Sequence, residues 1–160
     1  MRSLLFAAIL LLALVASHAA VVRLAPEFGF PGPGNKTLAL RSLRGQAVVL
    51  LIAKTPNNSA FKKQLRYLQE TYEQFAGKQV VFIAAFAEGE GPVKSNIPFA
   101  VAPNGPAIAN AYGTTGDFTL VIIGKDGNVD YQTPKVCPPE RVRDVIQNSF
   151  AVQESARKGQ

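Results

Sequence analysis

Two unbroken apolar runs, separated by an amphipathic segment, constrain the fold of this 160-residue chain more than any other feature. The runs are Ala47–Ala53 and Val80–Phe86. Short continuous runs rich in Val and Ile are typical of strands that are buried on both faces of a sheet. The segment between them repeats apolar residues three and four positions apart, as on one face of a helix: Phe61, Leu65, Leu68, Tyr72 and Phe75. The pattern predicts a right-handed parallel βαβ unit.

The rest of the chain continues an α/β pattern. We expect a short helix over Pro106–Tyr112 and a third buried strand over Phe118–Ile123. The turn Gly124–Gly127 then leads into an alternating edge strand, Asn128–Gln132. A last helix opens at the prolines before Glu140, and its buried stripe comprises Val142, Val145, Ile146 and Phe150. The Gly- and Pro-rich segments before the first strand and after the second are expected to be loops.

The N-terminus predicts export. Arg2 supplies one positive charge, an apolar stretch follows from Leu4 to Ala16, and Ser17-His18-Ala19 fits a small-x-small cleavage site. The stretch is shorter than the roughly 20 residues that a membrane span needs. We therefore expect a signal peptide at 1–19, a single domain at 20–152 and a polar tail at 153–160, in the periplasm or the extracellular space. Membrane contact is expected only through an uncleaved signal.

The composition excludes several kinds of catalytic and binding site. Cleavage removes His18, the only histidine, and leaves Cys137 as the only thiol. Without an imidazole, neither a Ser-His-Asp nor a Cys-His site can form, and one cysteine cannot build a zinc site. No phosphate-binding glycine motif is present, so we expect no metal and no cofactor. The net charge of +6 is spread without a basic run, so no nucleic-acid partner is expected.

Several segments match a known family in order and spacing. They are Ala25–Phe28, Leu40–Leu50, Ile97–Phe99, Ala109–Gly113 and Phe118–Val129. Together they resemble the thioredoxin-like superfamily, in particular peroxiredoxins (AhpC/TSA or redoxin type) and exported thiol-disulfide oxidoreductases. The resemblance covers about residues 25–150 and implies an α/β thioredoxin-like fold, with a central mixed β-sheet and flanking helices.

The redox groups of that family are missing here. The family places its reactive cysteine, or a Cys-x-x-Cys pair, at the start of the helix after the first central strand, where the helix N-terminus stabilises a thiolate. The corresponding window, Thr55–Lys63, contains no cysteine, and Gly116-Asp117 stands where the family carries a cis-proline. We call this end of the predicted sheet, where the family has its active site, the rim. We expect it to bind a protein or peptide partner through Thr55, Pro56, Asn57, Asn58, Ser59, Asp117 and Phe118.

Cys137 keeps an enzymatic alternative open. The predicted edge strand runs back toward the same rim, which would put Cys137 at the start of the last helix, where a thiolate is favoured. One hypothesis is therefore a partly exposed, modestly reactive catalytic Cys137, in a one-Cys thiol peroxidase or mixed-disulfide oxidoreductase. The other is an inert, packed cysteine in a binding or accessory protein without dithiol redox activity. The sequence leaves both open.

Overall fold

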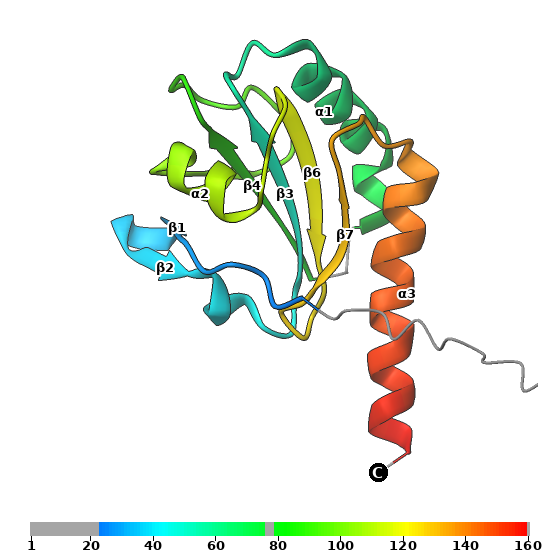
Figure 1. Cartoon of the computed structure of the whole chain (residues 1–160). Helices are drawn as coiled ribbons and strands as arrows, with labels where there is room; N and C mark the ends of the chain where they lie inside the picture. The colour runs from blue at the N-terminus through cyan, green and yellow to red at the C-terminus, as the bar shows by residue number, and fades with distance from the viewer. Residues whose placement is uncertain (1–22, 76–78, 160) are drawn as a thin grey trace, which may run out of the picture.

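A five-stranded mixed sheet lies at the centre of the computed structural model, which describes residues 23–75 and 79–159 (Figure 1). The predicted signal peptide lies outside the described residues. The strands follow the order β5-β4-β3-β6-β7. Their bounds are β3 Ala47–Ala53, β4 Val80–Phe86, β5 Phe99–Ala102, β6 Phe118–Ile123 and β7 Val129–Thr133.

The two apolar runs are neighbouring strands, as the sequence predicts. β3 pairs in parallel with β4 and antiparallel with β6, so that Leu50 lies opposite Ile83 on one side and Val121 on the other. Alternate residues of β3 enter two separate cores: Val49 packs in one and Leu50 in the other. A strand that is covered on both faces favours apolar residues at every position, which explains the unbroken pattern.

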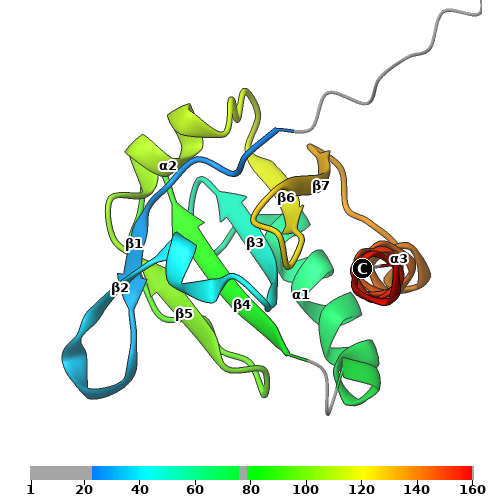
Figure 2. The ribbon, with the colours of Figure 1, turned by 90° about the horizontal axis from the view of Figure 1, so that it is seen from below.

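Helices cover both faces of the sheet (Figure 1, Figure 2). The first face packs against α1 Ser59–Thr71, which continues into a 3-10 turn, η3 Tyr72–Phe75, and against α3 Pro139–Lys158. The opposite face packs against α2 Gly105–Ala111. The predicted helical stripe of α1 is confirmed, because Phe61, Leu65, Leu68 and Phe75 are buried and Tyr72 is partly buried.

The segment before β3 is more ordered than the sequence suggests. The predicted loop contains two short strands, β1 Gly29–Pro31 and β2 Thr37–Ala39, which pair antiparallel around a 3-10 turn, η1 Pro33–Asn35. A second 3-10 turn, η2 Leu40–Leu43, buries Leu40 and Leu43 against the sheet. The edge strand β5 was also not predicted, since it is short and three of its four residues are only half-buried.

The start of the described chain runs along the outer edge of β7. The amide of Val129 donates to the carbonyl oxygen of Arg23 at 2.8 Å, and the amide of Ala25 donates to that of Gly127 at 3.0 Å. Leu24 forms an antiparallel bridge with Asn128 between these two bonds. The Arg23 guanidinium also donates to the side-chain oxygen of Gln132 at 2.6 Å. Arg23–Ala25 therefore supplies backbone partners to an otherwise open strand.

Helix α2 begins in close contact with the end of β4. A Cβ atom at Gly105 would overlap the carbonyl oxygen of Phe86, so only glycine fits this position. The preceding Asn104 has φ 61°, in the left-handed region that Asn tolerates better than most residues. This turn brings α2 directly onto the sheet.

Helix α3 continues to Lys158, past the predicted domain end at residue 152. Its predicted stripe is confirmed in its first half, where Val142 and Ile146 are fully buried. Val145 and Phe150 are partly buried, and the Lys125 ammonium lies 3.8 Å from the centre of the Phe150 ring.

Candidate functional site

Three charged residues meet at the end of the sheet where α1 begins, at the top of Figure 1. Lys54 follows β3, Glu88 lies just after β4 and Asp117 precedes β6. The Lys54 ammonium lies 3.2 Å from the Asp117 carboxylate and 3.5 Å from that of Glu88. Backbone bonds hold the three in register: Lys54 N donates to Asp117 O, and Glu88 N donates to Lys54 O.

This arrangement keeps Lys54 protonated. The hydrogen bond and charge of Asp117, followed by the charge of Glu88, raise the pKa of Lys54 above its usual value. An ammonium held in this way has no free electron pair, so it cannot act as a nucleophile or a base at neutral pH. The cluster therefore offers charge for recognition and no activated group.

The N-terminus of α1 is closed by its own sequence. The Asn58 side chain accepts a hydrogen bond from Phe61 N at 2.9 Å, as an N-cap residue does. Upstream, the Thr55 hydroxyl accepts from Asn57 N at 3.3 Å. The position where the thioredoxin family activates a thiol thus carries a capped turn.

A groove of about 630 Å³ opens beside this turn. One wall is the Thr55–Asn57 turn and the first half of α1, and the other is the loop Gly89–Lys94. Its apolar lining includes Phe61, Leu65 and Val93. The charged lining residues come from both walls: Lys62, Glu90 and Lys94. The groove joins residues that are distant in sequence into one concave surface.

The predicted rim is only partly assembled at the surface. Thr55 and Pro56 are half-exposed and Asn57 is exposed, and the Asp117 side chain is 66% exposed. The prediction for Phe118 is wrong: its side chain is buried in the core beneath α1 and α3, because β6 already begins there. No cis peptide bond occurs within the described residues, including the Asp117–Phe118 link.

Cys137 lies at the predicted end of the fold but not at its surface. Thr133 pairs with Leu120, so β7 does return the chain toward the rim before α3. There, Gln64 of α1 pairs with the Cys137 backbone: Nε2 donates to the carbonyl oxygen at 3.0 Å, and Oε1 accepts from the amide at 2.6 Å. This fully buried pair draws residue 137 into the core between the two helices.

The hypothesis that Cys137 is partly exposed is therefore wrong, and its burial agrees with the alternative of a packed cysteine. The residue is 2% exposed, and burial raises the pKa of its thiol above the usual value, against smaller opposing effects of Tyr131 and Arg141. The position near a helix start favours a thiolate, but the desolvation of the charged form outweighs it.

Sequence reasoning missed Lys54, Glu88 as its partner, and Gln64. A signal for the ion pairs was present, because residues that follow neighbouring parallel strands lie at one edge of the sheet. A signal for Gln64 was also present: it lies three residues after Phe61 and four before Leu68, within the apolar stripe. A polar residue in such a stripe needs a buried partner.

The described residues contain no cluster of His, Cys, Asp and Glu side chains that could hold a metal ion. In the same part of the chain, no helix combines the length and apolar character required to cross a membrane.

No protein-family profile and no curated protein matches this sequence. Solved structures do match. A Chlorobium tepidum protein described as a thiol:disulfide interchange protein DsbE superposes with a TM-score of 0.66 at 19% identity, covering 80% of this chain and 96% of that one. Thioredoxin peroxidase I of Plasmodium yoelii gives 0.63 at 15% identity, with 87% and 94% covered. The exposed lipoprotein thioredoxin Etrx1 of Streptococcus pneumoniae gives 0.57 at 19%, with 77% and 99% covered.

These three structures superpose on most of this chain, at identities that speak for the fold alone. The sequence contains one cysteine, Cys137, and this residue lies outside the Thr55–Lys63 window. This chain has the thioredoxin-like fold without cysteines at the usual redox position.

Proposed function

We propose that this chain is an exported thioredoxin-fold protein that binds a protein or peptide partner and has no dithiol redox activity. One observation carries the proposal: where the fold usually activates a thiol, this chain has an Asn58-capped turn and an ion-paired Lys54 beside an open groove. A thiolate is required for disulfide exchange, and the groove walls contain none.

The composition of the groove supports binding of an extended segment. Phe61, Leu65 and Val93 offer apolar contact, and the charged side chains at the margins supply polar partners. Lys62 and Lys94 outnumber Glu90 among them, which favours a partner with an acidic residue next to an apolar one. The positive net charge of the chain acts in the same direction.

Export is supported by the N-terminal sequence, which has the charge, apolar stretch and cleavage residues of a signal peptide. The fold is also that of an exposed lipoprotein thioredoxin. The destination we propose is the periplasm or the extracellular space. Secretion of a chain that carries a C-terminal tag, with sequencing of its mature N-terminus, tests this part of the proposal.

The thiol-enzyme alternative lacks support from the site. A peroxidase or a mixed-disulfide oxidoreductase needs an accessible thiolate, whereas Cys137 is buried and its pKa is raised. We therefore favour a binding function over a thiol-dependent enzymatic one.

Two measurements on the chain without residues 1–19 test the proposal. Insulin reduction and peroxide consumption should both stay at the uncatalysed rate, for the native protein and for Cys137→Ser alike. Disulfide exchange at the rate of an active thioredoxin, run alongside as the positive control, would overturn the absence of redox activity.

Binding is tested by photo-crosslinking within the exported fraction. A benzophenone amino acid at Asn57, on the groove wall, should give discrete adducts. The matched control places the same amino acid at Arg66, which is exposed on the outer face of α1. Equal adduct patterns from both positions would contradict binding in the groove.

A further inference from the structure

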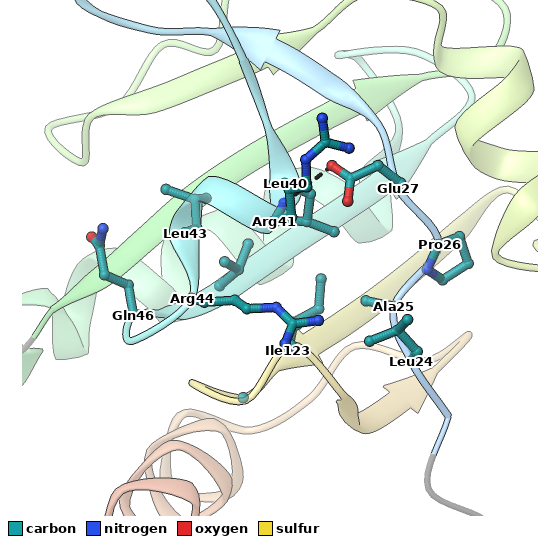
Figure 3. A pocket seen from close by; sticks show the side chains of 13 residues that line it. Leu24, Ala25, Pro26, Glu27, Leu40, Arg41, Leu43, Arg44, Gln46 and Ile123 are labelled. Atoms are coloured by element: carbon teal, nitrogen blue, oxygen red, sulfur yellow. Dashed lines mark hydrogen bonds between the residues drawn. The ribbon is translucent and has the colours of Figure 1, made fainter.

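A second concave surface lies at the opposite end of the sheet, where β3 begins and β6 ends (Figure 3). Its volume is about 250 Å³. Buried apolar side chains from β3, η2 and β6 form its base: Val48, Leu40, Leu43 and Ile123. The lip is Leu24, which is 60% exposed and is the one large apolar side chain that is exposed among the described residues.

One positively charged side chain, that of Arg44, lies across this pocket. Figure 3 shows the Arg44 side chain lying across the opening, with its guanidinium group toward Ile123 and Leu24. The side chain passes close over Gly127, because a Cβ atom added there would lie 3.4 Å from Nε of Arg44. The Arg44 guanidinium forms no ion pair or hydrogen bond with any described residue. Within the described part of the chain, no group competes with a ligand for its donors.

The other charged groups of the pocket leave that cation unneutralised. Arg41 and Glu27 also line it. Oε1 of Glu27 accepts a hydrogen bond from the backbone amide of Arg41 at 3.1 Å, so this carboxylate is engaged at the start of η2. Two arginines against one glutamate give the lining a net charge of one positive unit.

We propose that this pocket binds a small monocarboxylate with an apolar body, such as a short aliphatic acid. The apolar part would contact Leu24, Leu40 and Leu43, and the carboxylate would accept hydrogen bonds from the planar fork of Arg44. The size fits this class: a cavity of roughly 150 Å³ holds benzene, and pockets for drug-sized ligands begin at about 300 Å³. The site is separate from the groove beside α1, and its ligand is independent of the proposed partner.

Titration of the labelled protein with hexanoate, followed by methyl and amide NMR, tests the site. Saturable shifts should appear at Val48, Leu43 and Ile123, with a dissociation constant in the low-millimolar range, as about eight non-hydrogen atoms allow. Hexanamide has nearly the same shape without the charge, and we expect it to bind about five-fold more weakly.

Arginine variants separate the charge of Arg44 from the charge of the whole protein. Arg44→Gln should weaken hexanoate binding about five-fold, whereas Arg66→Gln, which removes the same charge from α1, should leave it unchanged. Arg44→Lys should retain most of the affinity, and the NMR spectrum of each variant reports its folding. The proposal is overturned by the absence of saturable shifts, by equal affinity for hexanamide, or by equal affinities of the Arg44→Gln and Arg66→Gln variants.

Discussion

Gln64 and Cys137 are joined by two hydrogen bonds, in which a single side-chain amide satisfies both the amide and the carbonyl group of one backbone residue. The two residues lie 73 positions apart, on α1 and just before α3. The pair therefore fixes the junction of the two helices and decides that the chain's only thiol is buried.

Replacing Gln64 by Leu should destabilise the fold by about 3 kcal/mol. The substitution keeps a similar volume but leaves the buried amide and carbonyl of Cys137 without partners, at a cost of about 1–3 kcal/mol each. Urea denaturation measures the change. Glu70→Leu on the exposed face of α1 is the control and should shift the free energy of unfolding by less than about 0.5 kcal/mol. Equal losses in both variants would refute the role of the pair.

The thiol of Cys137 should react slowly and only at high pH. Because burial raises its pKa, the apparent pKa from iodoacetamide alkylation should exceed the value of about 8.5 for a free thiol. Unfolding in urea should restore the ordinary rate. The folded state holds this proton more tightly than the unfolded state, so stability falls as the pH rises from the ordinary thiol pKa to the raised one. Cys137→Ala should remove that loss.

The Tyr112 hydroxyl should stabilise the segment that precedes β1. It donates to the carbonyl oxygen of Pro26 at 2.9 Å, so Tyr112→Phe should cost about 1 kcal/mol. Burial raises the pKa of this phenol, and stability should therefore fall above about pH 10, where an unfolded tyrosine ionises. The variant should have a flatter profile than the native chain. Tyr67→Phe on α1 is the control, and a loss of equal size there would count against this contact.

Gly105→Ala should destabilise the protein by about 2–3 kcal/mol, because the added Cβ would displace the Phe86 carbonyl group at the end of β4. The control is Gly116→Ala, where a Cβ would meet no atom within 4 Å and φ is not positive. That variant should be neutral or slightly more stable. Thermal unfolding compares the two, and similar midpoints would contradict the close approach.

The charge cluster should be visible in the titration of Lys54. Asp117→Asn should lower the pKa of the Lys54 ammonium more than Glu88→Gln does, because Asp117 is its larger source of stabilisation. NMR of the lysine side-chain nuclei measures both shifts. Asp144→Asn on α3, outside the cluster, should leave the pKa unchanged. A larger effect from Glu88→Gln would reverse the assigned order.

The parts of the fold that the sequence predicted are those with the strongest burial. β3, β4 and β6 are covered on both faces: β3 and β4 are continuous apolar runs, and β6 is interrupted only by the buried Thr119. β1 and β2 are three residues long and only Phe30 among their residues is buried, so their side chains form neither an apolar run nor a clear alternation. Their pairing depends on tertiary contacts with η2 and the sheet.

The site was predicted less completely than the fold. The place of the Thr55–Ser59 turn could be found because it directly follows the apolar run that forms β3. The exposure of Cys137 could not, since it depends on Gln64, which is distant in sequence. Phe118 was misplaced for a simpler reason: the first residue of β6 already faces the core.

The contact of Arg23–Ala25 with the start of β7 protects an edge of the sheet. An edge strand with unpaired amide and carbonyl groups is a template for a strand from another molecule. Cleavage after Ala19 would retain the covering residues, whereas trimming past Ala25 would remove the partners of Val129 and Gly127. Loss of Arg23–Ala25 would therefore leave Val129 and Gly127 open to pairing with a strand from another copy of the domain.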